Sequence, residues 1–205
     1  MIAVIDYGMG NVGSIINMLH KIGTEAILTS ELEHIKMADK LILPGVGAFD
    51  MGMQRLGEHG LIDVIKEVTL EQKKPLLGIC LGMQMLGRKS EEGTSSGLCL
   101  IPFDNMRFSF SEDVRLKIPH MGWDAIASYK KEDPLLNDLS DYQRYYFVHS
   151  YHAVCDFEEN VLMRCDYGYD FVAAVKKDSI YGVQFHPEKS HKFGMALLEN
   201  FVGRV

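Results

Sequence analysis

The chain has 205 residues, of which 47% are hydrophobic and 24% are charged. This length and composition are those of a globular protein with a substantial core, and we expect a single domain over residues 1–205. The net charge of −7 argues against a protein that binds the phosphate backbone of nucleic acids, because such proteins carry an excess of lysine and arginine.

No apolar run is as long as a membrane span, and residues 1–6 lack the basic start and long apolar core of a secretory signal. The sequence therefore predicts a cytoplasmic protein that does not enter a membrane. Four cysteines without a C-x-x-C pair do not make a disulfide framework in a chain of this size, so we expect free thiols. His149, His152 and Cys155 lie three residues apart in a strand-like stretch and need not converge, so we expect neither a metal site nor a cofactor.

Strand and helix patterns alternate along the first half of the chain. Short apolar runs predict strands over residues 1–6, 25–29 and 40–43, and apolar residues at helical spacing predict helices over residues 12–21 and 50–72, the second interrupted at 57–60. This order is typical of a parallel sheet with helices on both faces. We therefore expect an α/β fold with an open, mostly parallel sheet.

A glycine-rich loop follows the first predicted strand. The segment Gly8–Gly13 fits G-x-G-x-x-G, and Glu31 lies about twenty residues further on, as a dinucleotide-binding site requires. However, Asp6 and Tyr7 separate the strand from the first glycine, and the chain has little room for the substrate domain of a hydride-transfer enzyme. A dinucleotide-binding module is therefore the non-enzyme alternative, and a structural turn is the interpretation that we favour.

The third predicted strand delivers Pro44-Gly45-Val46-Gly47 to the strand end at which open α/β sheets bind ligands. Backbone N–H groups in such a loop are natural donors to a negatively charged oxygen, and each well-placed donor can stabilise a transition state by roughly 3 kcal/mol. The alternative is a glycine-rich turn that binds nothing.

A buried strand that runs directly into a helix is predicted for the segment Pro75–Gln84. Within it, Gly78-x-Cys80-x-Gly82 matches the nucleophile elbow G-x-S-x-G, with sulfur in place of oxygen. The elbow is a sharp, strained turn that only glycine can flank without steric conflict. Its nucleophile sits at a helix N-terminus, where free N–H groups stabilise a thiolate. The alternative for Cys80 is a small buried core residue.

Near the other end of the chain, a predicted strand over residues 179–185 is followed by His186-Pro187-Glu188. A cysteine nucleophile requires a base, and the base requires an acid that orients it. His186 and Glu188 can supply both, and Pro187 stiffens the link between them. The sequence therefore predicts a Cys80–His186–Glu188 triad.

The second half of the chain has shorter strand patterns, which we interpret as antiparallel additions to the sheet. They cover residues 106–110, 123–128, 145–151, 161–166, 171–176 and 180–185, after a polar loop at 90–97, and an amphipathic helix at 192–202 ends the chain.

These motifs resemble those of the triad-type (class I) glutamine amidotransferases. Gly78–Gln84 and Gln184–Glu188 carry the resemblance, and Pro44–Phe49, Pro119–Trp123 and His149–His152 narrow it toward the glutaminase subunit of imidazole glycerol phosphate synthase. The match extends from Asp6-Tyr7-Gly8-Met9-Gly10-Asn11 to the last helix. It implies the flavodoxin-like fold of class I glutamine amidotransferases.

The resemblance also implies site roles. Cys80, His186 and Glu188 would form the catalytic triad. The oxyanion hole would consist of Val46, Gly47 and the N–H of Leu81. The substrate glutamine would contact Gly45, Gln84, His149, Ser150 and Tyr151. The face that meets a partner and passes ammonia to it would include Met121, Trp123, Tyr146 and Lys189.

The implied activity is hydrolysis of glutamine to glutamate and ammonia through a thioester on Cys80. The chain contains no evident synthase, so the resemblance implies a heterodimer with a (β/α)₈ cyclase. That cyclase would use the ammonia to make imidazole glycerol phosphate and aminoimidazole carboxamide ribotide in histidine biosynthesis.

Two residues depart from the family pattern, which tends to have glycine at Cys99 and asparagine at Asp124. They leave open a paralogous amidotransferase subunit that feeds another synthase, in surface-sugar amidation or vitamin B6 synthesis. A more distant alternative is a γ-glutamyl hydrolase or peptidase that acts without a partner.

Overall fold

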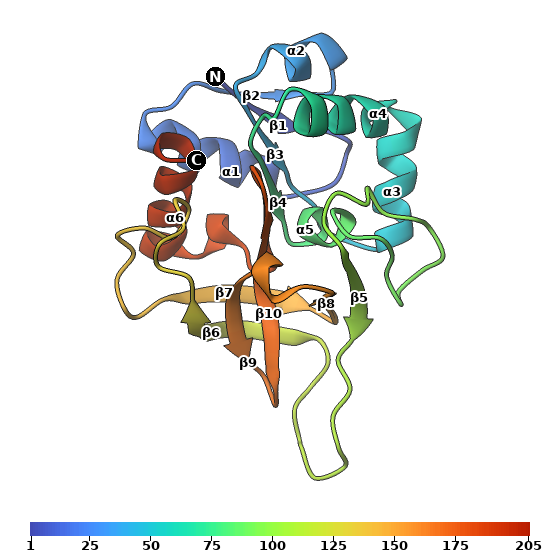
Figure 1. Ribbon diagram of the computed structural model, residues 1–205, viewed down its shortest axis with the longest axis vertical. Helices are drawn as coiled ribbons and strands as arrows, with labels where there is room; N and C mark the ends of the chain where they lie inside the picture. The colour runs from blue at the N-terminus through green and yellow to red at the C-terminus, as the bar shows by residue number, and fades with distance from the viewer.

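The computed structural model describes all 205 residues (Figure 1). Five of its strands form a parallel sheet. These strands are β1 (Ile2–Ile5), β2 (Ala26–Thr29), β3 (Lys40–Leu43), β4 (Leu76–Ile79) and β11 (Ile180–Val183). They lie in the order β2-β1-β3-β4-β11. The last strand of the chain therefore lies beside β4, so that the segments following β4 and β11 emerge next to each other at the carboxyl edge of the sheet.

Helices cover both faces of this parallel sheet (Figure 1). They are α1 (Val12–Ile22), α2 (Leu32–Met37), α3 (Phe49–Glu58), α4 (Leu61–Lys66), α5 (Leu81–Met85) and α6 (His191–Gly203), and a π-helical turn (Glu67–Glu71) continues α4. Successive residues of a strand point to opposite faces. In β1, Ile2 and Val4 pack on the core that includes α1 and α6, whereas Ala3 and Ile5 pack on the core that includes α2 to α5.

The remaining strands extend the sheet in antiparallel fashion. They are β5 (Phe103–Arg107), β6 (His120–Tyr129), β7 (Arg144–His149), β8 (Tyr151–Cys155), β9 (Val161–Asp166) and β10 (Asp170–Lys177). The order continues β11-β10-β9-β6-β7, and β8 pairs with both β10 and β5. Short 3-10 turns lie at Glu158–Asn160 and Pro187–Lys189. The expected α/β sheet with helices on both faces and antiparallel additions is thus confirmed.

Some predicted boundaries were wrong. The strand predicted over residues 145–151 is two strands. The first ends before Ser150 and the second begins after it, and the two have different partners: β7 pairs with β6, whereas β8 pairs with β5. Both halves keep apolar side chains, so the sequence pattern gives no sign of the change. The strand predicted over residues 106–110 begins at Phe103, and the short helix α2 was not predicted. No helix has the length and apolar character needed to cross a membrane.

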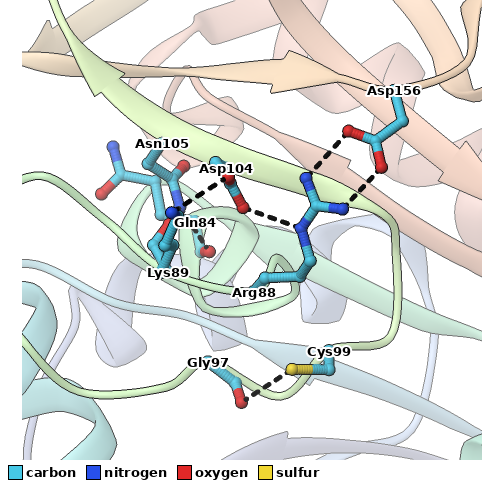
Figure 2. Close-up of polar contacts among 8 residues, drawn as sticks. All are labelled: Gln84, Arg88, Lys89, Gly97, Cys99, Asp104, Asn105 and Asp156. Carbon is cyan, nitrogen blue, oxygen red and sulfur yellow. Dashed lines mark hydrogen bonds and ion pairs between the residues drawn. The ribbon is translucent and has the colours of Figure 1, made fainter.

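Arg88 and Asn105 fix the segment that follows α5 (Figure 2). The Arg88 guanidinium pairs with Asp104 of β5 at 2.8 Å and with Asp156, just after β8, through two hydrogen bonds of 2.5 and 2.8 Å. The Asn105 side chain donates to the carbonyl groups of Gln84 and Lys89 at 2.9 and 3.0 Å. The C-terminal end of α5, which carries Gln84, is therefore fastened to the antiparallel part of the sheet.

Candidate active site

Cys80 lies on a strained turn between β4 and α5. Its backbone angles are φ 55° and ψ −110°, in the left-handed region that residues with a Cβ rarely adopt. A Cβ on Gly82 would lie 1.8 Å from the carbonyl oxygen of Leu43, and one on Gly78 would lie 2.7 Å from the carbonyl oxygen of Gly82. Only glycine fits at either position, as the elbow motif predicted, and the turn projects Cys80 beyond the end of the strand.

His186 and Glu188 form a closely packed pair after β11. His186 Nδ1 lies 2.8 Å from Glu188 Oε1, and both side chains are 1% exposed. The backbone N–H of His186 donates to the carbonyl of Tyr146 in β7 at 2.9 Å, which fixes the start of this turn. The buried Nε2 atom has no hydrogen-bond partner within the chain, so the other edge of the ring is free for a reacting group.

The pKa of His186 reflects its neighbours. Burial lowers this pKa, but the Cys80 sulfur and the Glu188 carboxylate outweigh burial and raise the value to about 9. The imidazole is therefore protonated near neutral pH. Cys80 and Glu188 thus act on His186 from its two sides, which is the arrangement of a nucleophile, a base and an orienting acid.

A pocket of about 300 Å³ opens where these elements meet. Its walls combine residues from well-separated parts of the sequence. The lining residues are Val46, Gly47, Cys80, Leu81, Gln84, Glu92, Pro119, Val148, His149, Ser150, Tyr151 and His186. Nine of the residues predicted for the triad, the oxyanion hole and substrate binding are among them. Glu188 and Gly45 do not line the pocket: Glu188 contacts His186, and Gly45 packs against Leu81 and Gly82.

The loop before α3 forms one wall of this pocket. The Tyr7 hydroxyl donates to the carbonyl of Pro44 at 2.6 Å, and a Cβ on Gly45 would lie 2.7 Å from that hydroxyl oxygen. Burial and the nearby Cys80 raise the pKa of Tyr7 well above its usual value, which keeps the hydroxyl a donor. Tyr7 therefore holds the loop against Leu81, with Val46 and Gly47 left at the pocket surface.

The G-x-G-x-x-G segment forms a turn beside this loop. Gly10 has a φ of 127°, and a Cβ there would lie 3.0 Å from the Cβ of Pro44. A Cβ on Gly13 would meet nothing within 4 Å. In a dinucleotide site the third glycine allows close packing of helix and strand, and no such packing exists here. Of these glycines, Gly10 is the one that packs against the loop from Pro44 to Gly47.

The Tyr151 carbonyl holds the residues of the pocket wall that lies opposite the Val46–Gly47 loop. It accepts hydrogen bonds from Gln84 Nε2 at 3.1 Å and from His149 Nδ1 at 2.8 Å. Burial lowers the pKa of His149 to about 3, so the ring is neutral with its proton on Nδ1. The Gln84 Oε1 atom has no partner within the chain and remains available at the pocket. Gln84, His149 and Tyr151 are therefore held as one unit.

Glu92 is a pocket residue that the sequence did not predict. Its Oε2 atom accepts a hydrogen bond of 2.8 Å from the backbone N–H of Phe49, at the start of α3. The surrounding loop is fastened by Asp50, which accepts from the N–H groups of Thr94 and Ser95 at 2.9 to 3.1 Å. Glu92 is the only carboxylate that lines the pocket.

The four residues predicted for a partner face lie outside the pocket but next to it. Trp123 of β6 pairs across the sheet with Tyr146 of β7, and Met121 pairs with the pocket residue Val148. The Lys189 ammonium lies 5.6 Å from the centre of the Tyr146 ring. Met121 is 62% exposed, so this surface combines apolar and cationic groups.

The comparisons with known proteins agree with this geometry. A family model described as glutamine amidotransferase class-I matches residues 3–205. Imidazole glycerol phosphate synthase subunit HisH 2 of Methanococcus maripaludis is 54% identical over 202 residues, which cover 98% of both chains. The protein of the same name from Pseudomonas aeruginosa is 51% identical over 205 residues, which cover 100% of both.

Among solved structures, a glutamine amidotransferase from Thermotoga maritima superposes with a TM-score of 0.69. It is 14% identical in sequence, and the alignment covers 98% of this chain and 95% of that one. At this identity the likeness supports the fold alone. Since the family model and the full-length relatives point the same way, the chain belongs to the class-I glutamine amidotransferases and, among them, to the family of HisH subunits of imidazole glycerol phosphate synthase.

Proposed function

We propose that Cys80, His186 and Glu188 hydrolyse glutamine, and that the ammonia passes to a cyclase partner. The observation that carries this proposal is that Cys80 and His186, which are distant in the sequence, line one pocket. The second edge of His186 is bound by a buried carboxylate. A surface cysteine or a core histidine needs neither arrangement.

In the first half of the reaction the Cys80 thiolate attacks the side-chain amide carbon of glutamine. The C–N bond breaks, and His186 gives its proton to the departing nitrogen, which leaves as ammonia. A γ-glutamyl thioester remains on Cys80. Because the pKa of His186 is about 9, the ring carries the proton that this step needs at neutral pH.

In the second half, a water molecule attacks the thioester while His186, now neutral, takes the proton from that water. The C–S bond breaks, glutamate leaves, and the thiolate and imidazolium are restored. Glu188 keeps the proton of Nδ1 directed toward itself and stabilises the positive ring. It acts through His186 and does not touch the substrate.

Both tetrahedral intermediates carry negative charge on oxygen. The N–H groups of Leu81 and of the Val46–Gly47 loop are the proposed donors to this oxygen, because both line the pocket at the Cys80 turn. Gln84, His149, Ser150 and Tyr151 would contact the glutamine backbone from the opposite wall, and Gly45 would support the loop. Glu92 is suited to bind the α-ammonium group of glutamine, since it is the carboxylate at the pocket.

The fate of ammonia argues for a heterodimer. Ammonium predominates in neutral water and is not a nucleophile, so an enclosed passage to the acceptor is needed. We assign the partner contact to Met121, Trp123, Tyr146 and Lys189. The first three lie on the paired strands β6 and β7, in which Met121 lies opposite the pocket residue Val148, and Lys189 contacts Tyr146. The partner would be a (β/α)₈ cyclase, and the pair would act as a lyase in the cytoplasm, in histidine biosynthesis.

A paralogous subunit is the second candidate. Both relatives named above carry the number 2 in their names, and Asp124 and Cys99 depart from the family pattern. Such a subunit would use the same triad to supply ammonia to another synthase, for example one that amidates a surface sugar.

Co-purification from the source cell, followed by glutaminase assays, tests the proposal. We expect a cyclase to co-purify, and we expect its ribulosyl phosphoribosyl carboxamide substrate to stimulate glutamate release. A Lys189→Glu variant should weaken binding of the cyclase, whereas Lys21→Glu, in the exposed last turn of α1, serves as a control outside the proposed partner face. Stimulation by a different acceptor, with a different bound synthase, would favour the paralogue.

A further inference from the structure

Gln184 is a completely buried amide whose side chain contacts two residues of the proposed site, Cys80 and Gln84. It directly follows β11, its side chain is 0% exposed, and it does not line the pocket. Its Nε2 atom lies 3.8 Å from the sulfur of Cys80, and its Oε1 atom accepts a hydrogen bond of 3.1 Å from Gln84 Nε2. Burying an amide is unfavourable unless its hydrogen bonds are made, so a leucine or methionine would fill this space more easily. The hydrogen bonds to Gln84 and Cys80 therefore explain why an amide occupies this position.

The direction of these hydrogen bonds is set by a backbone group. The Tyr151 carbonyl can only accept, so Gln84 must turn its NH₂ group toward it. The same nitrogen contacts Gln184, which must then present its oxygen. The NH₂ group of Gln184 is consequently directed at Cys80. His149 also donates to the Tyr151 carbonyl, which fixes that group in place.

We propose that Gln184 is a catalytic residue that donates a side-chain hydrogen bond to the Cys80 thiolate, with its orientation set by Gln84 and the Tyr151 carbonyl. The inference rests on the proposed role of Cys80 as nucleophile. A donor to sulfur stabilises the thiolate more than the neutral thiol, because hydrogen bonds to an ionised acceptor are the stronger ones. Through Gln184, the Cys80 sulfur is also linked to Gln84, so that the nucleophile and a proposed substrate-binding residue belong to one hydrogen-bonded group.

The test measures how fast iodoacetamide alkylates Cys80, read by mass spectrometry of the Cys80 peptide, at pH 6.5 and pH 9. In Gln184→Met, which keeps the side-chain length but lacks the donor, we expect the rate at pH 6.5 to fall about tenfold, or about 1.4 kcal/mol. At pH 9 the rate should stay within a factor of about two. Gln143→Met is the matched control, because Gln143 is 2% exposed and the hydrogen bonds of its side chain are to Ser140 and Tyr145, outside the pocket. The proposal would be overturned if the ratio of the rate at pH 6.5 to the rate at pH 9 were the same in Gln184→Met as in the wild type. It would also be overturned if Gln143→Met changed this ratio as much as Gln184→Met does.

A measurement on the wild-type protein keeps the proposal testable if Gln184→Met does not fold. The side-chain amide protons of Gln184 should move upfield in the NMR spectrum when Cys80 is alkylated, and those of Gln143 should not. An unchanged Gln184 signal would contradict the hydrogen bond. Failure of the proposed function is distinguishable, since it would appear as glutaminase activity that survives complete alkylation of Cys80.

Discussion

His186 Nδ1 lies 2.8 Å from Glu188 Oε1, and neither side chain is more than 1% exposed. The carboxylate therefore acts on the imidazole in a place that water does not reach. Since Glu188 Oε2 has no partner within the chain, its interaction with His186 is the one specific contact of this buried acid.

We predict that Glu188→Gln is impaired but active. The amide oxygen can still accept from Nδ1 and keep the tautomer, but the charge that stabilises the imidazolium is lost. We expect kcat for glutamine hydrolysis to fall about tenfold, measured as glutamate release, against a loss above about a thousandfold in His186→Ala. Equal loss in the two variants would show that Glu188 does more than orient His186.

Glu92→Gln should weaken substrate binding rather than the chemical step. The variant keeps an oxygen that accepts from Phe49 but loses the negative charge at the pocket. We expect KM for glutamine to rise about tenfold and kcat to stay within about threefold, because an ion pair at a partly exposed site contributes on the order of 1 kcal/mol.

The sharper test of Glu92 compares glutamine with 5-amino-5-oxopentanoate, which lacks the α-ammonium group. The wild type should prefer glutamine, and Glu92→Gln should lose most of that preference. Glu91→Gln is the matched control, since Glu91 accepts from the N–H of Arg107 and lies outside the pocket. A preference retained by Glu92→Gln would place the ammonium group elsewhere.

The buried histidines should make the protein unstable in acid. Burial lowers the pKa of His149 to about 3, below its ordinary value of 6.5, and it also lowers the pKa values of His120 and His152. The unfolded chain therefore binds protons below pH 6.5 that the folded protein does not, and stability falls as the pH drops from 6.5 toward 3. His149 alone accounts for about 2 kcal/mol at pH 5.

Urea unfolding at pH 7.5 and pH 5 measures this effect. The difference in unfolding free energy between the two pH values should be about 2 kcal/mol smaller in His149→Gln than in the wild type. The exposed His20→Gln serves as a control for loss of a histidine. If His149→Gln and the wild type lose the same stability between these pH values, His149 does not carry the effect.

Gly82→Ala and Gly13→Ala should have opposite effects on the stability of the fold. The added Cβ would overlap the Leu43 carbonyl in the first variant and would meet nothing within 4 Å in the second. We expect Gly82→Ala to lose several kcal/mol, on the order of the cost of overpacking, or not to fold. Gly13→Ala, near the start of α1, should be stabilised by roughly 0.5 to 1 kcal/mol. Thermal unfolding gives both values, and an unstable Gly13→Ala would restore the case for a functional G-x-G-x-x-G loop.

The parts of the fold that the sequence predicted well are those in which local pattern and burial agree. The strands at 40–43 and 161–166 were predicted with the observed bounds, because each is a short run of apolar or strand-forming residues. The elbow at Cys80 was recognisable because its glycines are required by contacts within a few residues and with the adjacent strand.

Other features depend on contacts between distant segments. Glu92 lies in the polar loop at 90–97, and Asp50 holds that loop by accepting hydrogen bonds from the backbone of Thr94 and Ser95, which the local sequence does not encode. The hydrogen bond from Gln184 to Cys80 depends on the neighbouring position of β4 and β11, which no local pattern encodes.

Cys80 is the nucleophile of the proposed mechanism, and glutamate release by Cys80→Ser tests this role most directly. Cys165→Ser is the matched control, because Cys165 is also buried but its sulfur contacts the Ala125 carbonyl, outside the pocket. We predict that Cys80→Ser folds and loses more than about a thousandfold of kcat, a barrier increase of about 4 kcal/mol, whereas Cys165→Ser stays within about threefold of the wild type. A folded Cys80→Ser protein that retains substantial glutaminase activity would contradict the mechanism.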